Sequence, residues 1–103
     1  MDATGDTKVV VIGGAGQAGK IHVNNLISLG ADVASFDVVD NEKATKNYNA
    51  KTAAHSECVN DGYNVALVAL PDTMLFDHTL KIIDAGFKRI MVEKPGSQTS
   101  EQI

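Results

Sequence analysis

The stretch Val11–His22, VIGGAGQAGKIH, holds four glycines within seven residues, directly after an apolar run and before a segment with helical periodicity. The preceding run, Lys8–Ile12, is dominated by β-branched residues, as in a strand buried on both faces of a parallel sheet. The stretch therefore predicts a strand-to-helix turn. Its glycines match two overlapping patterns, and the motif alone leaves both open: Gly14-x-Gly16-x-x-Gly19 and Gly13-x-x-Gly16-x-x-Gly19.

The residues after these glycines predict a helix that begins at Gln17. Its expected buried stripe recurs at helical spacing and comprises Ala18, Ile21, His22, Asn25, Leu26 and Leu29. Gly30 stands where a helix commonly ends on a left-handed glycine. On this stripe, His22 is expected to be a packed, hydrogen-bonded core residue rather than a metal ligand.

The rest of the chain alternates between strand and helix patterns. Strands are predicted at Asp32–Asp37, Val65–Leu70 and Arg89–Val92, with a brief one around Ala53 and Ala54. Helices are predicted from the N-cap Asn41 to about Tyr48, and from Thr73 to Ala85 before Gly86. Such alternation, with short connections and right-handed crossovers, predicts a doubly wound parallel sheet of the α/β class, the Rossmann fold.

Composition narrows the function classes. The 103 residues suffice for one domain, and we expect residues 1–7 to form a flexible tail and residues 8–103 a dinucleotide-binding domain. The net charge of −4 and the scattered basic residues argue against nucleic-acid and membrane partners. Without a signal peptide or membrane-spanning run, the expected location is the cytoplasm. The single cysteine, Cys58, is predicted to be structural, and no cluster has metal-ligand spacing.

The glycines lie in the context that a dinucleotide-binding fingerprint requires, between a strand and a helix. In that interpretation Gly14 permits the tight turn, Gly16 lets a pyrophosphate approach the backbone, and Gly19 lets the helix pack closely on the strand. The amides of Gln17 and Ala18, at the positive end of the helix dipole, would bind the anion.

Asp37 ends the second predicted strand, 23 residues after Gly14. This is close to the offset of about 20 residues at which an acidic side chain meets the adenine ribose hydroxyls of a dinucleotide. A carboxylate there repels a 2′-phosphate, so Asp37 favours NAD over NADP. Lys43 and Lys46, a few residues further on, are the cations that temper this preference.

The strand order decides which segments meet the glycines. Ligands of open α/β sheets bind beyond the carboxyl ends of the strands, where the strand order reverses. With the order 3-2-1-4-5, the glycine loop would converge with Leu70-Pro71-Asp72 and Glu93-Lys94-Pro95. Leu70, Pro71, Glu93 and Lys94 are therefore further candidates for cofactor contact. Lys94 is the candidate catalytic residue, because a lysine beside the nicotinamide can exchange a proton with an alcohol.

Three stretches resemble one oxidoreductase family: GGAGQAGKIHVNNL, VALVALP and DAGFKRIMVEKPGSQTSEQI. They are similar to the nucleotide-binding half of the glucose-fructose oxidoreductase, inositol dehydrogenase and rhizopine catabolism family, Gfo/Idh/MocA. Its glycine loop commonly ends in a histidine, matched by His22, and its most telling motif is Glu-Lys-Pro after the fifth strand, matched by Glu93-Lys94-Pro95. The resemblance covers almost the whole chain from Lys8.

The resemblance implies hydride transfer between NAD(P) and a secondary hydroxyl of a sugar, cyclitol or related polyol, with Lys94 beside the nicotinamide and substrate. Further catalytic residues of the family come from a second, C-terminal domain that also forms the oligomer. Two positions depart from the family: Leu70 and Leu75 replace its usual Thr or Ser before the strand-four proline and its His after it. His78, nearby, is expected on the helix surface.

The last residues of the sequence contain a signal for the start of a helix, but not the residues of the helix itself. Thr99-x-x-Gln102 reads as a capping box, and only Ile103 follows, which predicts a chain truncated before the substrate domain and catalytically incomplete alone. Exposure of the surface toward that domain predicts modest stability or self-association as a homo-oligomer.

Two other functions stay open. The first is a non-enzymatic Rossmann module for nucleotide sensing or protein association. The second takes the Gly13-x-x-Gly16-x-x-Gly19 pattern literally and points to dihydrodipicolinate-type reductases or extended short-chain dehydrogenases. The short-chain enzymes require Tyr-x-x-x-Lys, and neither Tyr48 nor Tyr63 has a lysine four residues later.

Overall fold

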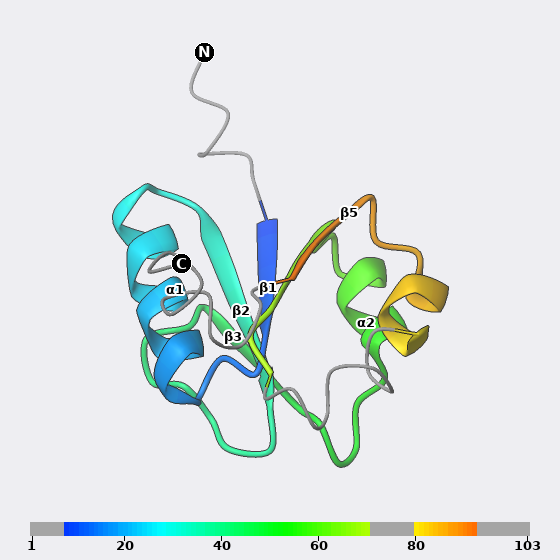
Figure 1. Cartoon of the computed structure of the whole chain (residues 1–103), viewed down its shortest axis with the longest axis horizontal. Coiled ribbons are helices and arrows are strands. Elements are labelled where there is room, and N and C mark those ends of the chain that lie inside the picture. Colours follow the sequence, from blue (N-terminus) through cyan, green and yellow to red (C-terminus); the bar gives the residue numbers. More distant parts are fainter. Residues whose placement is uncertain (1–7, 71–79, 93–103) are drawn as a thin grey trace, which may run out of the picture.

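Five parallel strands in the order β3-β2-β1-β4-β5 organise the computed structural model, which describes residues 8–70 and 80–92 (Figure 1). In chain order the elements are β1 (Lys8–Ile12), α1 (Gln17–Ser28), β2 (Asp32–Asp37), β3 (Lys46–Asn49), α2 (His55–Asn60), β4 (Val65–Val68) and β5 (Arg89–Val92). Residues 80–85 are also helical. The predicted α/β class, Rossmann fold and strand order are confirmed.

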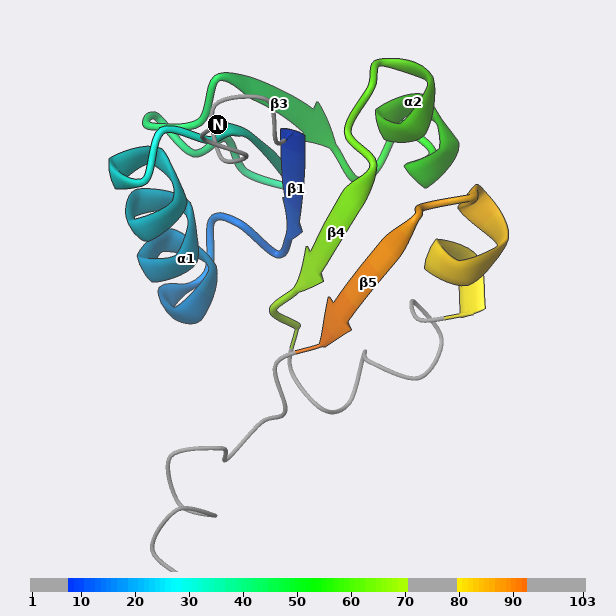
Figure 2. The same ribbon diagram turned by 90° about the horizontal axis from the view of Figure 1, so that it is seen from above.

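The helices cover opposite faces of the sheet, as the view from above shows (Figure 2). Val11 of β1 and Val33 of β2 pack with Val23 of α1 on one face. The other face carries the larger apolar cluster, from Val10 and Ile12 to Ile82 in the helical segment 80–85. Because β1 lies between two strands and two helical layers, its residues Val9–Ile12 are at most 2% exposed.

The bounds of β1 and β2 are those predicted, and β4 ends two residues earlier than expected, at Val68. Gly30 and Gly86 have positive φ angles of 90° and 96°, as expected of glycines that end helices. Of the predicted helix Thr73–Ala85, residues 80–85 are helical, and residues 71–79 lie outside the described part.

The predicted buried stripe of α1 is wrong at most of its positions, although Leu26 packs against the core. Ile21 and Leu29 are 60% and 61% exposed, whereas Gly19 and Val23 are the buried positions of the helix. His22 is half-buried at the margin of this contact. The reason is steric: α1 packs against the glycine loop at Gly19, where a side chain would overlap the backbone of Gly13 and Gly14, so Gly19 must face the loop.

The segment after β2 also differs from the prediction. Residues 46–49 form β3 rather than a helix, and Ala54 is the N-cap of α2 rather than part of a strand. The residues of β3 are mostly polar, so the sequence shows no strand pattern there. Tyr48 is the one buried residue of the strand. Backbone hydrogen bonds from Thr45 to Val33 and from Ala50 to Asp37 bracket this pairing with β2, so contacts distant in sequence override local propensity.

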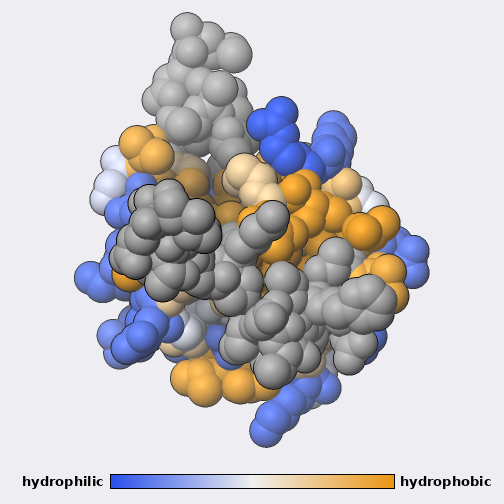
Figure 3. Space-filling model, viewed as in Figure 1, coloured by the Kyte–Doolittle hydropathy of each residue, from blue (hydrophilic) through white to orange (hydrophobic). Residues whose placement is uncertain are grey.

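Apolar side chains remain on the described surface, where Figure 3 shows apolar patches among the polar residues. The most exposed of them lie on α1, after β2, and in residues 80–92: Ile21, Leu29, Val38, Val39, Leu80, Ile83, Met91 and Val92. Within residues 8–70 and 80–92, no helix combines the length and apolar character needed to cross a membrane.

Alkaline pH is expected to unfold this domain because three buried acids, Cys58, Tyr63 and Tyr48, must stay protonated. Burial and the hydrogen bond to Asp61 raise the pKa of Tyr48 above its ordinary value. Burial raises the pKa of the Cys58 thiol from 9.0 to about 12, and burial with the hydrogen bond to Asp32 raises the pKa of Tyr63 above its ordinary 10.0. A raised folded-state pKa stabilises the fold fully below the unfolded value, and this stability is lost as pH rises. The urea midpoint should therefore fall steadily from about pH 9 upward.

A Cys58→Ala/Tyr63→Phe double variant is the control, and its midpoint should fall less steeply with pH than that of the wild-type chain. Equal slopes for the two proteins would refute this assignment.

Candidate functional site

The glycine loop lies where the strand order reverses, between the carboxyl ends of β2 and β4. The Gly13 amide donates a 2.8 Å hydrogen bond to the Phe36 carbonyl of β2, and the Ala69 amide donates one of 2.8 Å to the Ile12 carbonyl of β1. Open α/β sheets bind their ligands at such a reversal. Of the predicted convergence, the contact of Gly13 with Ala69 and Leu70 lies within the described residues, and Pro71, Asp72 and Glu93-Lys94-Pro95 lie outside them.

The tight turn is made by Gly13, whereas the sequence predicted that Gly14 would make it. Its φ is +89°, and a Cβ there would lie 2.7 Å from the Ala69 carbonyl oxygen. Gly14 is not among the described glycines with positive φ, but its Cβ would overlap Ser35, lying 2.9 Å from the Ser35 Cβ. The turn needs glycine at residue 13 for conformation and at residue 14 for space.

Gly19 and Gly16 differ sharply in their surroundings. A Cβ on Gly19 would overlap the carbonyl group of Gly13 and lie 2.7 Å from the Gly14 Cα, so this glycine lets α1 pack onto the loop. A Cβ on Gly16 would meet only the Gly13 oxygen, at an ordinary 3.5 Å. Gly16 has φ −76° and ψ 174°, which any residue adopts. No contact among the described residues thus requires glycine at position 16.

Gln17 and Ala18 form the start of α1 immediately after the N-cap Gly16, and both are exposed. The first turn of α1 contains no acidic residue. First-turn amides of a helix lack intrahelical acceptors and carry the positive end of the helix dipole. This end of α1 can therefore attract an anion.

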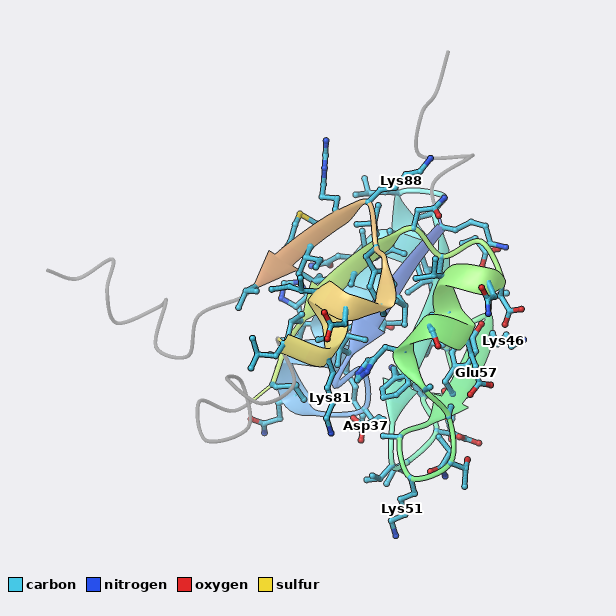
Figure 4. The ribbon with its side chains drawn as sticks, turned by 90° about the vertical axis from the view of Figure 1, so that its right-hand side faces the viewer. Asp37, Lys46, Lys51, Glu57, Lys81 and Lys88 are labelled. Atoms are coloured by element: carbon cyan, nitrogen blue, oxygen red, sulfur yellow. The ribbon has the colours of Figure 1, made fainter. Side chains whose placement is uncertain are left out.

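Asp37, the last residue of β2, contacts the glycine loop directly. Its Oδ2 accepts a 3.0 Å hydrogen bond from the Ala15 amide, and its Oδ1 accepts one of 2.6 Å from the Val38 amide. The residue is half-buried, and each carboxylate oxygen keeps further acceptor capacity. In Figure 4, Asp37 lies at the end of the sheet opposite Lys88, which precedes β5.

The two lysines near Asp37 in the sequence are placed differently. Lys46 begins β3 at the amino end of the sheet, where its Nζ lies 3.1 Å from Asp61 Oδ2 and over the Tyr48 ring. Lys46 therefore lies at the end of the sheet opposite the glycine loop. Lys43 lies on the β2–β3 connection and lines a cavity of about 290 Å³ with Lys20 of α1.

Asn41 is the residue of this region that the sequence interpretation missed, since it was expected only as a helix N-cap. It is 4% exposed, and its Nδ2 donates a 2.8 Å hydrogen bond to the Gly14 carbonyl oxygen. Its Oδ1 does accept a backbone hydrogen bond, from Lys43, as a capping side chain would. The contact with Gly14 joins residues 27 positions apart, and no local signal reveals it.

The other candidates lie partly outside the described residues. Leu70 is close to the loop, since its Cδ2 would lie 3.1 Å from a Cβ on Gly13. Pro71, Glu93, Lys94 and the neighbouring Pro95 fall outside residues 8–70 and 80–92. Within those ranges, no group of three or more His, Cys, Asp or Glu side chains could hold a metal ion.

The sequence matches the family described as "Oxidoreductase family, NAD-binding Rossmann fold", GFO_IDH_MocA, over residues 7–103. No curated protein matches the chain. Among solved structures, the fold is similar to that of RSP, a Rex-family repressor, with TM-score 0.68 and 14% identity over 93% of this chain and 56% of that one. It is also similar to the Bordetella bronchiseptica enzyme WbmF in complex with NAD+ and UDP, with TM-score 0.52 and 20% identity over 89% of this chain and 36% of that one.

At these identities the two structures support the fold alone, and the chain spans about half the length of the first and about a third of the second. The family match is of another kind, because it covers nearly the whole chain and agrees with the glycine loop at the strand-order reversal. The chain therefore belongs to the Gfo/Idh/MocA oxidoreductase family, as its NAD-binding Rossmann domain.

Proposed function

We propose that the glycine loop binds the pyrophosphate of NAD, with Gly16 beside the phosphates and the Gln17 and Ala18 amides as donors. The observation that carries this proposal is the space at Gly16: its three neighbouring glycines are required by protein contacts, and Gly16 is not. A glycine that the protein itself does not need is explained by a ligand approaching its backbone. The uncapped positive end of α1 supports the same anion site.

We propose that Asp37 binds the adenine ribose hydroxyls and favours NAD over NADP. Its carboxylate adjoins the glycine loop through Ala15, and it retains lone pairs for two hydroxyl donors. Its negative charge opposes a 2′-phosphate. The placement of Lys46 beside Asp61 strengthens this preference, since that lysine is held away from the loop.

The reaction that we propose is hydride transfer between NAD and a secondary hydroxyl of a sugar, cyclitol or related polyol. Lys94, two residues after β5, would exchange the hydroxyl proton, with Leu70, Pro71 and Glu93 near the nicotinamide half. NAD itself supplies the hydride acceptor, and this chain contributes cofactor binding and one proton-transfer group. A second domain would supply substrate specificity.

The test of cofactor binding is a titration with NADH followed by nicotinamide fluorescence. The wild-type chain should bind saturably, and Gly16→Val should weaken binding by at least about 30-fold, because its side chain would occupy the space proposed for the pyrophosphate. Circular dichroism of Gly16→Val should match the wild type, since the backbone angles suit valine and the added Cβ would meet only the Gly13 oxygen, at an ordinary 3.5 Å.

Ser28→Val, at the opposite end of α1, is the matched control and should bind NADH as the wild type does. Absence of saturable binding by the wild-type chain, or equal affinity of Gly16→Val, would overturn the proposal.

A further inference from the structure

Asn41 joins the glycine loop to the β2–β3 connection through a buried side-chain amide. One end of that amide, Nδ2, donates to the Gly14 carbonyl oxygen at 2.8 Å. The other end, Oδ1, accepts from the Lys43 backbone amide at 2.8 Å. Because one partner is an acceptor and the other a donor, only one orientation of the amide satisfies both.

Asn47 in turn holds the backbone of Asn41. The Asn47 Oδ1 accepts a 2.8 Å hydrogen bond from the Asn41 amide, and the Asn47 Nδ2 donates one of 3.1 Å to the Asn41 carbonyl oxygen. Asn47 itself is fixed in β3, where it pairs with Ser35 of β2. Asn41 is therefore anchored to the sheet and not only to its own turn.

The peptide between Gly14 and Ala15 is consequently held at both of its polar atoms. Its oxygen accepts from Asn41, and its N–H donates to Asp37 Oδ2 at 3.0 Å. A peptide unit is planar, so two contacts on opposite sides fix the orientation of the whole plane. This plane directly precedes Gly16.

We propose that Asn41 is a positioning residue for cofactor binding, which acts by holding the Gly14 carbonyl away from the pyrophosphate. A carbonyl oxygen carries partial negative charge, and one that turned toward the phosphates would repel them. The buried hydrogen bond to Asn41 prevents that rotation, while Asp37 holds the N–H end of the same peptide. The inference rests on the proposed pyrophosphate site.

Asn41→Asp separates this role from simple capping. An aspartate keeps an oxygen for the Lys43 amide, so a residue that only capped the turn would tolerate the change. It also places an oxygen against the Gly14 oxygen, where a donor is needed, and so destroys the proposed clamp. Asn41→Asp should therefore bind ADP-ribose at least tenfold more weakly than the wild type, and more weakly than Asn41→Ala.

Adenosine, which lacks phosphate, gives the second measurement by calorimetry, and its affinity should change less than twofold. Asn24→Asp is the matched control. Asn24 and Asn41 both line the 290 Å³ cavity, so the substitution adds the same charge there without changing the contact to Gly14. Hydrogen exchange in the unliganded chain gives the third measurement: the Ala15 amide should exchange at least tenfold faster in Asn41→Asp and unchanged in Asn24→Asp.

The outcomes separate the two proposals. A wild-type chain that binds no ADP-ribose overturns the proposed function and this role with it. Wild-type binding with Asn41→Asp within twofold overturns the positioning role alone. Equal losses for ADP-ribose and adenosine assign Asn41 to folding rather than to the loop. An unchanged Ala15 exchange rate shows that Asn41 does not hold this peptide, and it also overturns the positioning role.

Discussion

Gly19→Ala is expected to lower the free energy of unfolding by about 3 kcal/mol, at the upper end of the cost of overpacking. The added Cβ would lie 2.7 Å from both the Gly13 carbonyl carbon and the Gly14 Cα. These are backbone atoms of a turn that the Gly13 and Ala15 amides hold to β2, through Phe36 and Asp37, so they cannot swing aside as a flexible side chain would. Urea denaturation measures the change, and NADH binding should be lost with the loop geometry.

The sign of this result is informative, because alanine is a better helix former than glycine by about 1 kcal/mol. Propensity alone therefore predicts that Gly19→Ala stabilises α1. Gly16→Ala is the control: its Cβ meets one atom at 3.5 Å, and the loss should stay within about 1 kcal/mol, the difference between the two residues as N-caps. A stabilised or unchanged Gly19→Ala would contradict the close packing of α1 on the loop.

Asp37→Ser is expected to change the cofactor preference. The wild-type chain should bind NADH at least about 100-fold more tightly than NADPH, because the carboxylate accepts from ribose hydroxyls and repels a 2′-phosphate. Serine removes the charge and leaves a short hydroxyl, so NADH affinity should fall about tenfold while NADPH affinity rises. The preference should therefore drop to tenfold or less, measured by paired fluorescence titrations.

Asp40→Ser is the matched control for Asp37→Ser. Asp40 lies on the β2–β3 connection three residues after Asp37, lines the cavity that Lys20 and Lys43 also line, and is exposed. Its removal changes the net charge equally, so the NADH to NADPH preference should move by no more than about threefold. An unchanged preference in Asp37→Ser, or an equal shift in Asp40→Ser, would remove Asp37 from the ribose site.

Much of the site was predictable because its signals are local. Residue type and spacing alone identify the four glycines, the β-branched run before them and the carboxylate at the end of β2. The short alternating elements also led to the strand order, which brings the glycine loop against Ala69 and Leu70.

The errors fall where a partner distant in sequence decides the structure. The segment 46–49 is a strand because it pairs with β2, although its own residues are mostly polar. The face of α1 that meets the sheet depends on Gly19 packing against Gly13, and not on which stripe is most apolar. In both cases a contact made only in the folded chain outweighs local propensity.

The sequence by itself determined the α/β class, the family resemblance and the glycine and carboxylate candidates, because these depend on residue type at short spacing. Only the tertiary structure decided which glycine makes the turn, which glycine the protein does not need, and that Asn41 holds the loop. The turn is a backbone angle of Gly13, the space at Gly16 is a property of the folded loop, and the contact of Asn41 with Gly14 spans 27 positions, so no pattern of neighbouring residues encodes these facts.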